Sequence, residues 1–165
     1  MKILLLCLIV TCCTYIGYGL SSYYRKRLKI FRDCHSFSNK LIVEINFAKN
    51  NLKEIIKSSI NSYSSDFKSV LNGYLNYLNS DAKVLATEQL FKKNNFLSDD
   101  EKQTIFLFFK SLGRYDAENQ ILEIEHFKQK FESMCASAES ENKKYSSLYI
   151  KLGLMFGILV AILLI

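Results

Sequence analysis

Four cysteine and histidine side chains are the residues of this sequence best suited to chemistry. They are Cys34, His35, His126 and Cys135. Thiolate and imidazole groups are the usual zinc ligands, but structural zinc sites are typified by a C-x-x-C pair or by two closely spaced histidines. Neither spacing occurs here. We therefore expect no metal site, and we interpret the four residues as small apolar thiols on helix faces and surface histidines.

Catalytic motifs are also missing from the sequence. It contains no glycine-rich phosphate loop, no G-x-S-x-G and no H-E-x-x-H, and its six glycines are scattered. The acidic pairs Asp99–Asp100 and Glu123–Glu125 fit a helix start and a solvated helix face better than a general acid and base. Because catalysis needs a positioned nucleophile, base or metal, we expect a protein without enzymatic activity and without a cofactor.

The clearest chemical feature is a set of basic residues beside apolar segments. Its members are Arg25, Lys26, Arg27, Lys29, Arg32, Lys143, Lys144 and Lys151. The formal net charge is +6, but from Asp33 onward 16 basic residues balance 16 acidic ones, so the excess lies at the N-terminal end. This location argues against a nucleic-acid partner. A juxtamembrane cluster fixes topology and attracts anionic lipid, at about 1 kcal/mol per basic residue.

The apolar segments beside these basic residues predict two transmembrane helices. Ile3–Leu20 carries no charge and would cover about 27 Å as a helix, against a hydrocarbon core of about 30 Å. Leu152–Ile165 also carries no charge and is shorter, but residues 148–150 extend it if Lys151 snorkels toward the headgroups. Three of the five cysteines, Cys7, Cys12 and Cys13, lie in the first segment, and the other two are expected to be reduced thiols.

A cleaved signal peptide is the rival interpretation of the first segment. Lys2 followed by Ile3–Val10 resembles its charged and apolar regions, but no small-x-small cleavage site follows, and Thr11 before Cys12 does not fit a lipoprotein signal. Five basic residues directly after the segment resist translocation. We therefore expect the domain between the segments to be cytoplasmic, with both termini on the other side of the cell membrane.

The middle of the chain predicts helices. The sequence has no proline, and only Gly73 and Gly113 interrupt residues 25–151. Apolar residues recur with helical period from Phe31 to Ile55, from Phe67 to Leu78, from Val84 to Phe91 and from Ala117 to Ala138. The helix at 105–112 is apolar on nearly every side, so we place it at the centre of a bundle. The apolar stripe from Ala117 to Ala138 is expected to pack into the core of the same chain. The alternative is that it packs against a partner helix in a coiled coil.

Specific residues predict where these helices begin and end. Asn50 and Asn51 mark a break, as do Ser80 and Asp81. Ser98 to Glu101 forms a capping box, Gly113 suits a left-handed helix end, and Asp116 suits the next N-cap. The predicted fold is all-α, a compact antiparallel bundle of five or six helices between two terminal transmembrane helices. The domains are residues 1–24, 25–147 and 148–165.

Several segments of the chain resemble the stage III sporulation protein AB family of endospore-forming bacteria. They are Glu44-Ile45-Asn46-Phe47, Ser111-Leu112-Gly113-Arg114-Tyr115-Asp116 with Gln120, and Lys144-Tyr145-Ser146-Ser147-Leu148-Tyr149 leading into Gly153 and Gly157. The chain departs from the family pattern at two places. Prolines often follow the first of these segments in the family, whereas this chain has Lys49-Asn50-Asn51-Leu52 there, and Tyr115 stands where the family has a serine.

The resemblance implies a membrane component of the channel-forming machine between mother cell and forespore. It implies a helical bundle like that of the inner-membrane platform proteins of type II secretion, which anchors the assembly and docks a cytoplasmic secretion-type ATPase. Other stage III channel proteins, membrane lipid and a second copy are the expected partners. Glu44, Gly113, Asp116 and Gln120 match motif positions, as partner contacts or as structural residues; capping alone explains Gly113 and Asp116.

Two other classes of function stay open from the sequence. One is a membrane-tethered regulator or signal-relay protein, whose bundle would couple the two spans. The other is a tethered enzyme, for which no site is evident. Tight binding of a nucleotide, metal or small acid would favour the enzyme.

Overall fold

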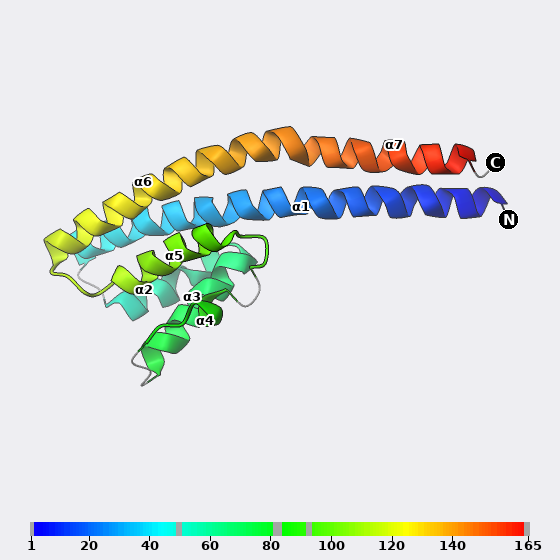
Figure 1. Ribbon diagram of the computed structural model, residues 1–165. Coiled ribbons are helices and arrows are strands. Elements are labelled where there is room, and N and C mark those ends of the chain that lie inside the picture. The colour runs from blue at the N-terminus through cyan, green and yellow to red at the C-terminus, as the bar shows by residue number, and fades with distance from the viewer. Residues whose placement is uncertain (1, 49–50, 81–83, 92–93, 164–165) are drawn as a thin grey trace. The chain divides into compact units, whose positions relative to one another are not determined.

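The computed structural model describes residues 2–48, 51–80, 84–91 and 94–163, with the side chains of residues 2–6 and 48 excepted. In this part of the chain every regular element is helical. The predicted all-α class is therefore confirmed (Figure 1). The elements are α1 (Lys2–Val43), η1 (Glu44–Ala48), α2 (Leu52–Ser59), η2 (Ile60–Ser62), α3 (Ser65–Asn79), α4 (Thr87–Leu90), α5 (Asp99–Ser111), α6 (Ala117–Glu141), η3 (Asn142–Ser146) and α7 (Ser147–Leu163).

The chain forms two compact units. The first consists of residues 1–28 and 136–165, and the second of residues 29–135. These bounds follow packing, whereas the predicted domains 1–24, 25–147 and 148–165 follow hydropathy, so the two divisions describe different properties of the chain. The helices α1 and α6 each contribute residues to both units.

In the first unit, the N-terminal part of α1 and α7 lie side by side and antiparallel (Figure 1). Glycines permit the close approach. A Cβ added at Gly17 would lie 2.5 Å from the carbonyl oxygen of Tyr149, and one added at Gly153 would lie 2.8 Å from the carbonyl oxygen of Cys13. Small residues at such contacts are typical of helix pairs in membranes, where dispersion between close backbones replaces the hydrophobic effect.

Polar and aromatic contacts continue the pairing between residues 21–27 of α1 and residues 141–149. The ring of Tyr24 stacks on those of Tyr145 and Tyr149, with centroids 5.4 and 5.8 Å apart. The Ser21 and Ser146 hydroxyls lie 2.6 Å apart, and Arg27 donates to Glu141 over 2.5 Å.

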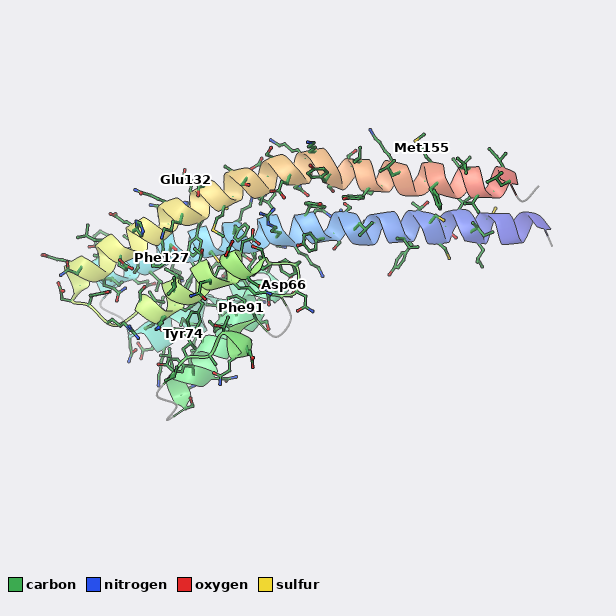
Figure 2. All side chains as sticks on the ribbon, viewed as in Figure 1. Asp66, Tyr74, Phe91, Phe127, Glu132 and Met155 are labelled. Carbon is green, nitrogen blue, oxygen red and sulfur yellow. The ribbon has the colours of Figure 1, made fainter. Side chains whose placement is uncertain are left out.

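The second unit has a core of aromatic and aliphatic side chains. Phe108 on α5 is fully buried, and its ring contacts those of Phe37, Phe127 and Phe131 from α1 and α6. Tyr74 on α3 meets the same core through Phe109. Figure 2 labels Tyr74 and Phe127 on their helices, and both rings are buried. Edge-to-face ring pairs of this kind add about 0.5–1.5 kcal/mol each to the burial of apolar area.

Most of the predicted helix ends are confirmed. Asn51 caps α2 by accepting from the N–H of Lys53, and Ser98 with Glu101 forms the predicted capping box of α5. Gly113 has φ of 77°, the left-handed conformation expected after a helix. Asn50 and Asp81, which we also placed at breaks, lie outside the described residues.

Two predictions about the helices were wrong in detail. The segment from Val84 to Phe91 forms only the short helix α4, because Ala86 has extended backbone. We placed the helix at 105–112 at the centre of the bundle, but only one side of α5 is covered: Ile105, Phe108 and Phe109 are buried, whereas Leu107 is 42% exposed. Its composition overstated its burial, since an apolar residue on a helix can face solvent without cost to the fold.

Candidate functional site

The turn between α5 and α6 is held by one side chain of α6. Leu112 ends α5, Gly113 turns the chain, and the N–H of Gly113 donates to Oε1 of Gln120 over 2.8 Å. The turn requires a residue that tolerates positive φ and an acceptor for a backbone donor. The sequence RYD that follows Gly113 then leads into the first turn of α6.

A cavity of about 200 Å³ lies beside this turn. Its walls come from α1, η1, α2, the turn and α6, and the lining residues are Leu41, Ile45, Leu52, Ile55, Leu112, Gly113, Tyr115, Ala117 and Gln120. The inner part of the lining is buried, with Leu41 at 0%, Ile55 at 2% and Gln120 at 5% exposure. Gly113, Tyr115 and Ala117 are exposed, so the cavity reaches the surface between them. We call it the Gln120 cavity.

The Gln120 side chain is only half satisfied. Its Oε1 accepts from Gly113, but its Nε2 is buried without a hydrogen-bond partner. The orientation of the amide is fixed, because only the oxygen can accept from a backbone N–H. A buried N–H group without an acceptor costs about 1–3 kcal/mol, and such groups are rare in folded proteins.

The four predicted motif residues do not all lie at this cavity. Gly113 and Gln120 line it, whereas Asp116 and Glu44 are not among its lining residues. Asp116 precedes α6 and is exposed; hydrogen bonds from the Asn119 side chain and nearby backbone N–H groups hold the pKa of its carboxyl below the usual value. Glu44 begins η1, one residue before the cavity residue Ile45.

A second cavity of about 390 Å³ shares Leu112 and Gly113 with the first. Lys110 and Arg114 line it together with Tyr74 and Tyr77. Cationic and phenolic groups together suit an anionic or polar side chain.

The basic residues predicted to mark the membrane boundary lie mostly on exposed faces. Arg25, Lys26, Lys29, Arg32 and Lys151 are exposed. Arg27 differs, since it is half-buried against Glu141. Lys143 pairs with Glu139 over 3.1 Å. Two cations lie over rings of the first unit: Arg25 over Tyr18 at 4.6 Å and Lys144 over Tyr145 at 5.1 Å.

One helix of the described chain is long and apolar enough to cross a membrane. It runs through α6, η3 and α7, from Ala117 to Leu163, and only 6% of its most apolar window is buried. The core helix of a soluble protein would be mostly buried there. Since the side chains of residues 2–6 are outside the described part, a first span over Ile3–Leu20 stays a prediction.

The residues Cys34, His35, His126 and Cys135 do not form a ligand set in the described part of the structure. Cys34 is fully buried, and desolvation raises the pKa of its thiol well above the usual value, with smaller contributions from Asp33 and Cys135. Across the described residues, no three His, Cys, Asp or Glu side chains are grouped to hold a metal ion.

Sequence reasoning missed the cavity and the backbone around it. Periodicity placed Leu41, Ile45, Leu52 and Ile55 on one apolar stripe, and turn chemistry singled out Gly113, but neither joins these residues in space. It also missed that Glu44–Ala48 and Asn142–Ser146 are π-helical. Both coincide with segments of the family resemblance, and π-helical turns occur frequently at functional sites.

Comparison of the chain with models of known protein families gives a match. The model of stage III sporulation protein AB matches residues 2–165, almost the whole chain. The chain belongs to the stage III sporulation protein AB family. Comparison with curated proteins and with solved structures gives no match. The cavity and the helix pair described above are thus found in a member of this family.

Proposed function

We propose that this member of the stage III sporulation protein AB family is a non-enzymatic platform component of the sporulation channel. It anchors the assembly in the mother-cell membrane and docks a cytoplasmic secretion-type ATPase. The match to the family over residues 2–165 carries the proposal. The described residues add an apolar helix suited to a membrane and a helical unit of residues 29–135 with its own core.

In this proposal two helices cross the membrane, the N-terminal part of α1 and α7. Their close approach at Gly17 and Gly153 supports an antiparallel pair of helices in lipid, where tight backbone packing replaces the hydrophobic effect. The stacked rings of Tyr24, Tyr145 and Tyr149 lie where the chain changes from apolar to basic. Aromatic rings and basic residues together are typical of the membrane interface.

The basic residues support one orientation of this helix pair in the membrane. Five basic residues follow the first span and Lys143 and Lys144 precede the second, so the unit of residues 29–135 is cytoplasmic by the positive-inside rule. Anionic headgroups would then meet the exposed cations Arg25 and Lys26. A cytoplasmic unit is what an ATPase can reach.

Copurification with the ATPase tests the proposal. The full-length protein, extracted in mild detergent, is loaded on an affinity resin and incubated with the secretion-type ATPase of the same sporulation system. The type IV pilus ATPase of another bacterium serves as the non-cognate control. We expect retention of the cognate ATPase only. Equal retention of both ATPases, or of neither, by detergent-extracted protein that is folded would overturn the docking role.

A further inference from the structure

We propose that the cavity of about 390 Å³ beside Arg114 is the docking site for an acidic segment of the cytoplasmic ATPase. The segment places a carboxylate at the rim of the cavity and a neighbouring apolar side chain inside it. We call the site the Arg114 cavity. The inference rests on the proposed function in naming the ATPase as the source of the segment. Three observations carry it, which are the apolar interior, the cationic rim and the volume.

Apolar and aromatic side chains form the interior of the Arg114 cavity. Tyr74 on α3 and Phe109 on α5 line it with ring centroids 4.9 Å apart, and both side chains are buried. Leu85 and Leu112 also line the cavity and are buried. The interior therefore favours an apolar group, since burial of apolar surface against such walls stabilises a complex.

Two cations lie at the rim of the cavity. Lys110 near the end of α5 and Arg114 in the turn before α6 both line the cavity, and both are exposed. The charge of Arg114 acts on the interior. Burial raises the pKa of Tyr74 and Tyr77 raises it further, whereas the positive charge of Arg114 lowers it. Because Coulomb interactions weaken with distance, this effect places the guanidinium near the Tyr74 side chain.

No carboxylate in the described part of the chain neutralises these two cations. Neither Lys110 nor Arg114 forms an ion pair there, and the described lining contains no aspartate or glutamate. A carboxylate on the occupant supplies the complementary charge. A nucleic acid does not fit, because the excess of positive charge is local: from Asp33 onward, 16 basic residues balance 16 acidic ones.

The volume of the cavity favours a peptide segment over a small ion. A cavity of about 150 Å³ with aliphatic walls holds a benzene molecule, so about 390 Å³ accommodates two neighbouring side chains. A free phosphate or acetate ion would meet the cations but leave the apolar interior unfilled. A neutral lipid chain would fill the interior but leave the cations without a counter-charge. An acidic residue next to a large apolar one satisfies both parts of the cavity.

Charge reversal at the rim tests the site without changing the core. Lys110→Glu and Arg114→Glu reverse the two charges, whereas Arg114→Lys keeps the charge. Lys130→Glu is the matched control for Lys110→Glu, because Lys130 is an exposed lysine on a helix of the same unit and does not line the cavity. The Nζ of each lysine lies over a phenylalanine ring, at 5.8 Å from Phe106 for Lys110 and at 5.3 Å from Phe127 for Lys130. Thermal unfolding of each full-length variant shows whether the fold persists.

Binding of the purified cognate ATPase to the full-length protein in nanodiscs of neutral lipid is the first measurement. We expect Lys110→Glu and Arg114→Glu each to weaken binding by about tenfold or more, Arg114→Lys to weaken it less, and Lys130→Glu to leave it unchanged. If the wild type binds and the folded Arg114→Glu variant binds equally well, the cavity is not the docking site, while the proposed function stands. The same conclusion follows if Lys130→Glu weakens binding as much as Lys110→Glu.

Spore formation separates failure of the site from failure of the proposed function. If the wild type does not bind the ATPase, the proposed function is wrong. A loss of spores of about tenfold in Lys110→Glu and Arg114→Glu cells, with normal numbers for Lys130→Glu, would then retain the cavity as the docking site for an acidic segment of a different protein. Normal spore numbers in all three strains would overturn the cavity as well.

Discussion

A disulfide between Cys13 and a cysteine placed at residue 157 would test the helix pair of the first unit. A Cβ built on Gly157 lies 3.2 Å from the Cβ of Cys13 and 3.1 Å from the Cα of Val10. Disulfides have Cβ–Cβ distances of about 3.5–4.5 Å, with a mean near 3.8 Å. The two helices must therefore separate by only about 0.6 Å to form the bond.

The variant Gly157→Cys is prepared with Cys13 as the other cysteine, and with alanine at Cys7, Cys12, Cys34 and Cys135. Isolated membranes are oxidised with copper phenanthroline, denatured, and reacted with a maleimide of high mass. Chains that formed the disulfide bind no maleimide and keep their original mobility. We expect most of the chains to lose both thiols within minutes.

The matched control keeps Cys12 in place of Cys13. Cys12 is exposed, and successive helical residues point about 100° apart, so its thiol faces away from residue 157. We expect little cross-linking there. Equal cross-linking of Cys12 and Cys13, or none with either, would refute the antiparallel pairing of α1 and α7. A product of twice the mass would indicate contact between two copies instead.

Three further predictions concern the second unit, each measured on the full-length protein in detergent. Phe108→Ala should cost about 3–5 kcal/mol in the free energy of unfolding, because the ring is fully buried among other rings, while Leu107→Ala should cost under about 1 kcal/mol. Gly113→Ala should cost about 1–2 kcal/mol from φ of 77° alone, since no atom lies within 4 Å of the added Cβ, and Gly113→Asn should cost less. Cys34 should react with maleimide only upon unfolding, because it is buried and its pKa is raised, whereas Cys135 should react in the folded protein.

Each of these has a clear contrary result. Similar costs for the substitutions at Phe108 and Leu107 would mean that the aromatic core is not packed as described. An equal loss for alanine and asparagine at Gly113 would mean that the positive φ is not the source of the cost, because asparagine adopts positive φ more readily than alanine. Rapid labelling of Cys34 in the folded protein would contradict its burial.

Local chemistry in the sequence predicted the helix ends well. The Ser98 to Glu101 capping box, the cap at Asn51 and the left-handed Gly113 each depend on hydrogen bonds or backbone preferences within a few residues. Such interactions are visible in sequence because both partners are neighbours in the chain. Hydropathy is also a local property of the sequence, and it correctly predicted that the segment of α7 is apolar.

Packing was less predictable, because periodicity gives the direction of a face but not its width. The stripe of α1 through Phe31 and Cys34 is buried, but Ile30 and Phe37 beside it are buried as well. Leu107 shows the opposite error, because it lies in a strongly apolar segment and is nevertheless exposed. How far a face is covered depends on which helices pack on it, and these come from distant parts of the chain.

The Gln120 cavity was beyond sequence reasoning for the same reason, yet the structure also separates two roles of Gln120. The turn at Gly113 uses only the oxygen of the side chain, so stability alone requires an acceptor and not an amide. The amide nitrogen adds a buried donor that costs about 1–3 kcal/mol while it is unpaired. Gln120→Glu separates the two roles, because it retains the acceptor of the turn and removes the buried amide donor.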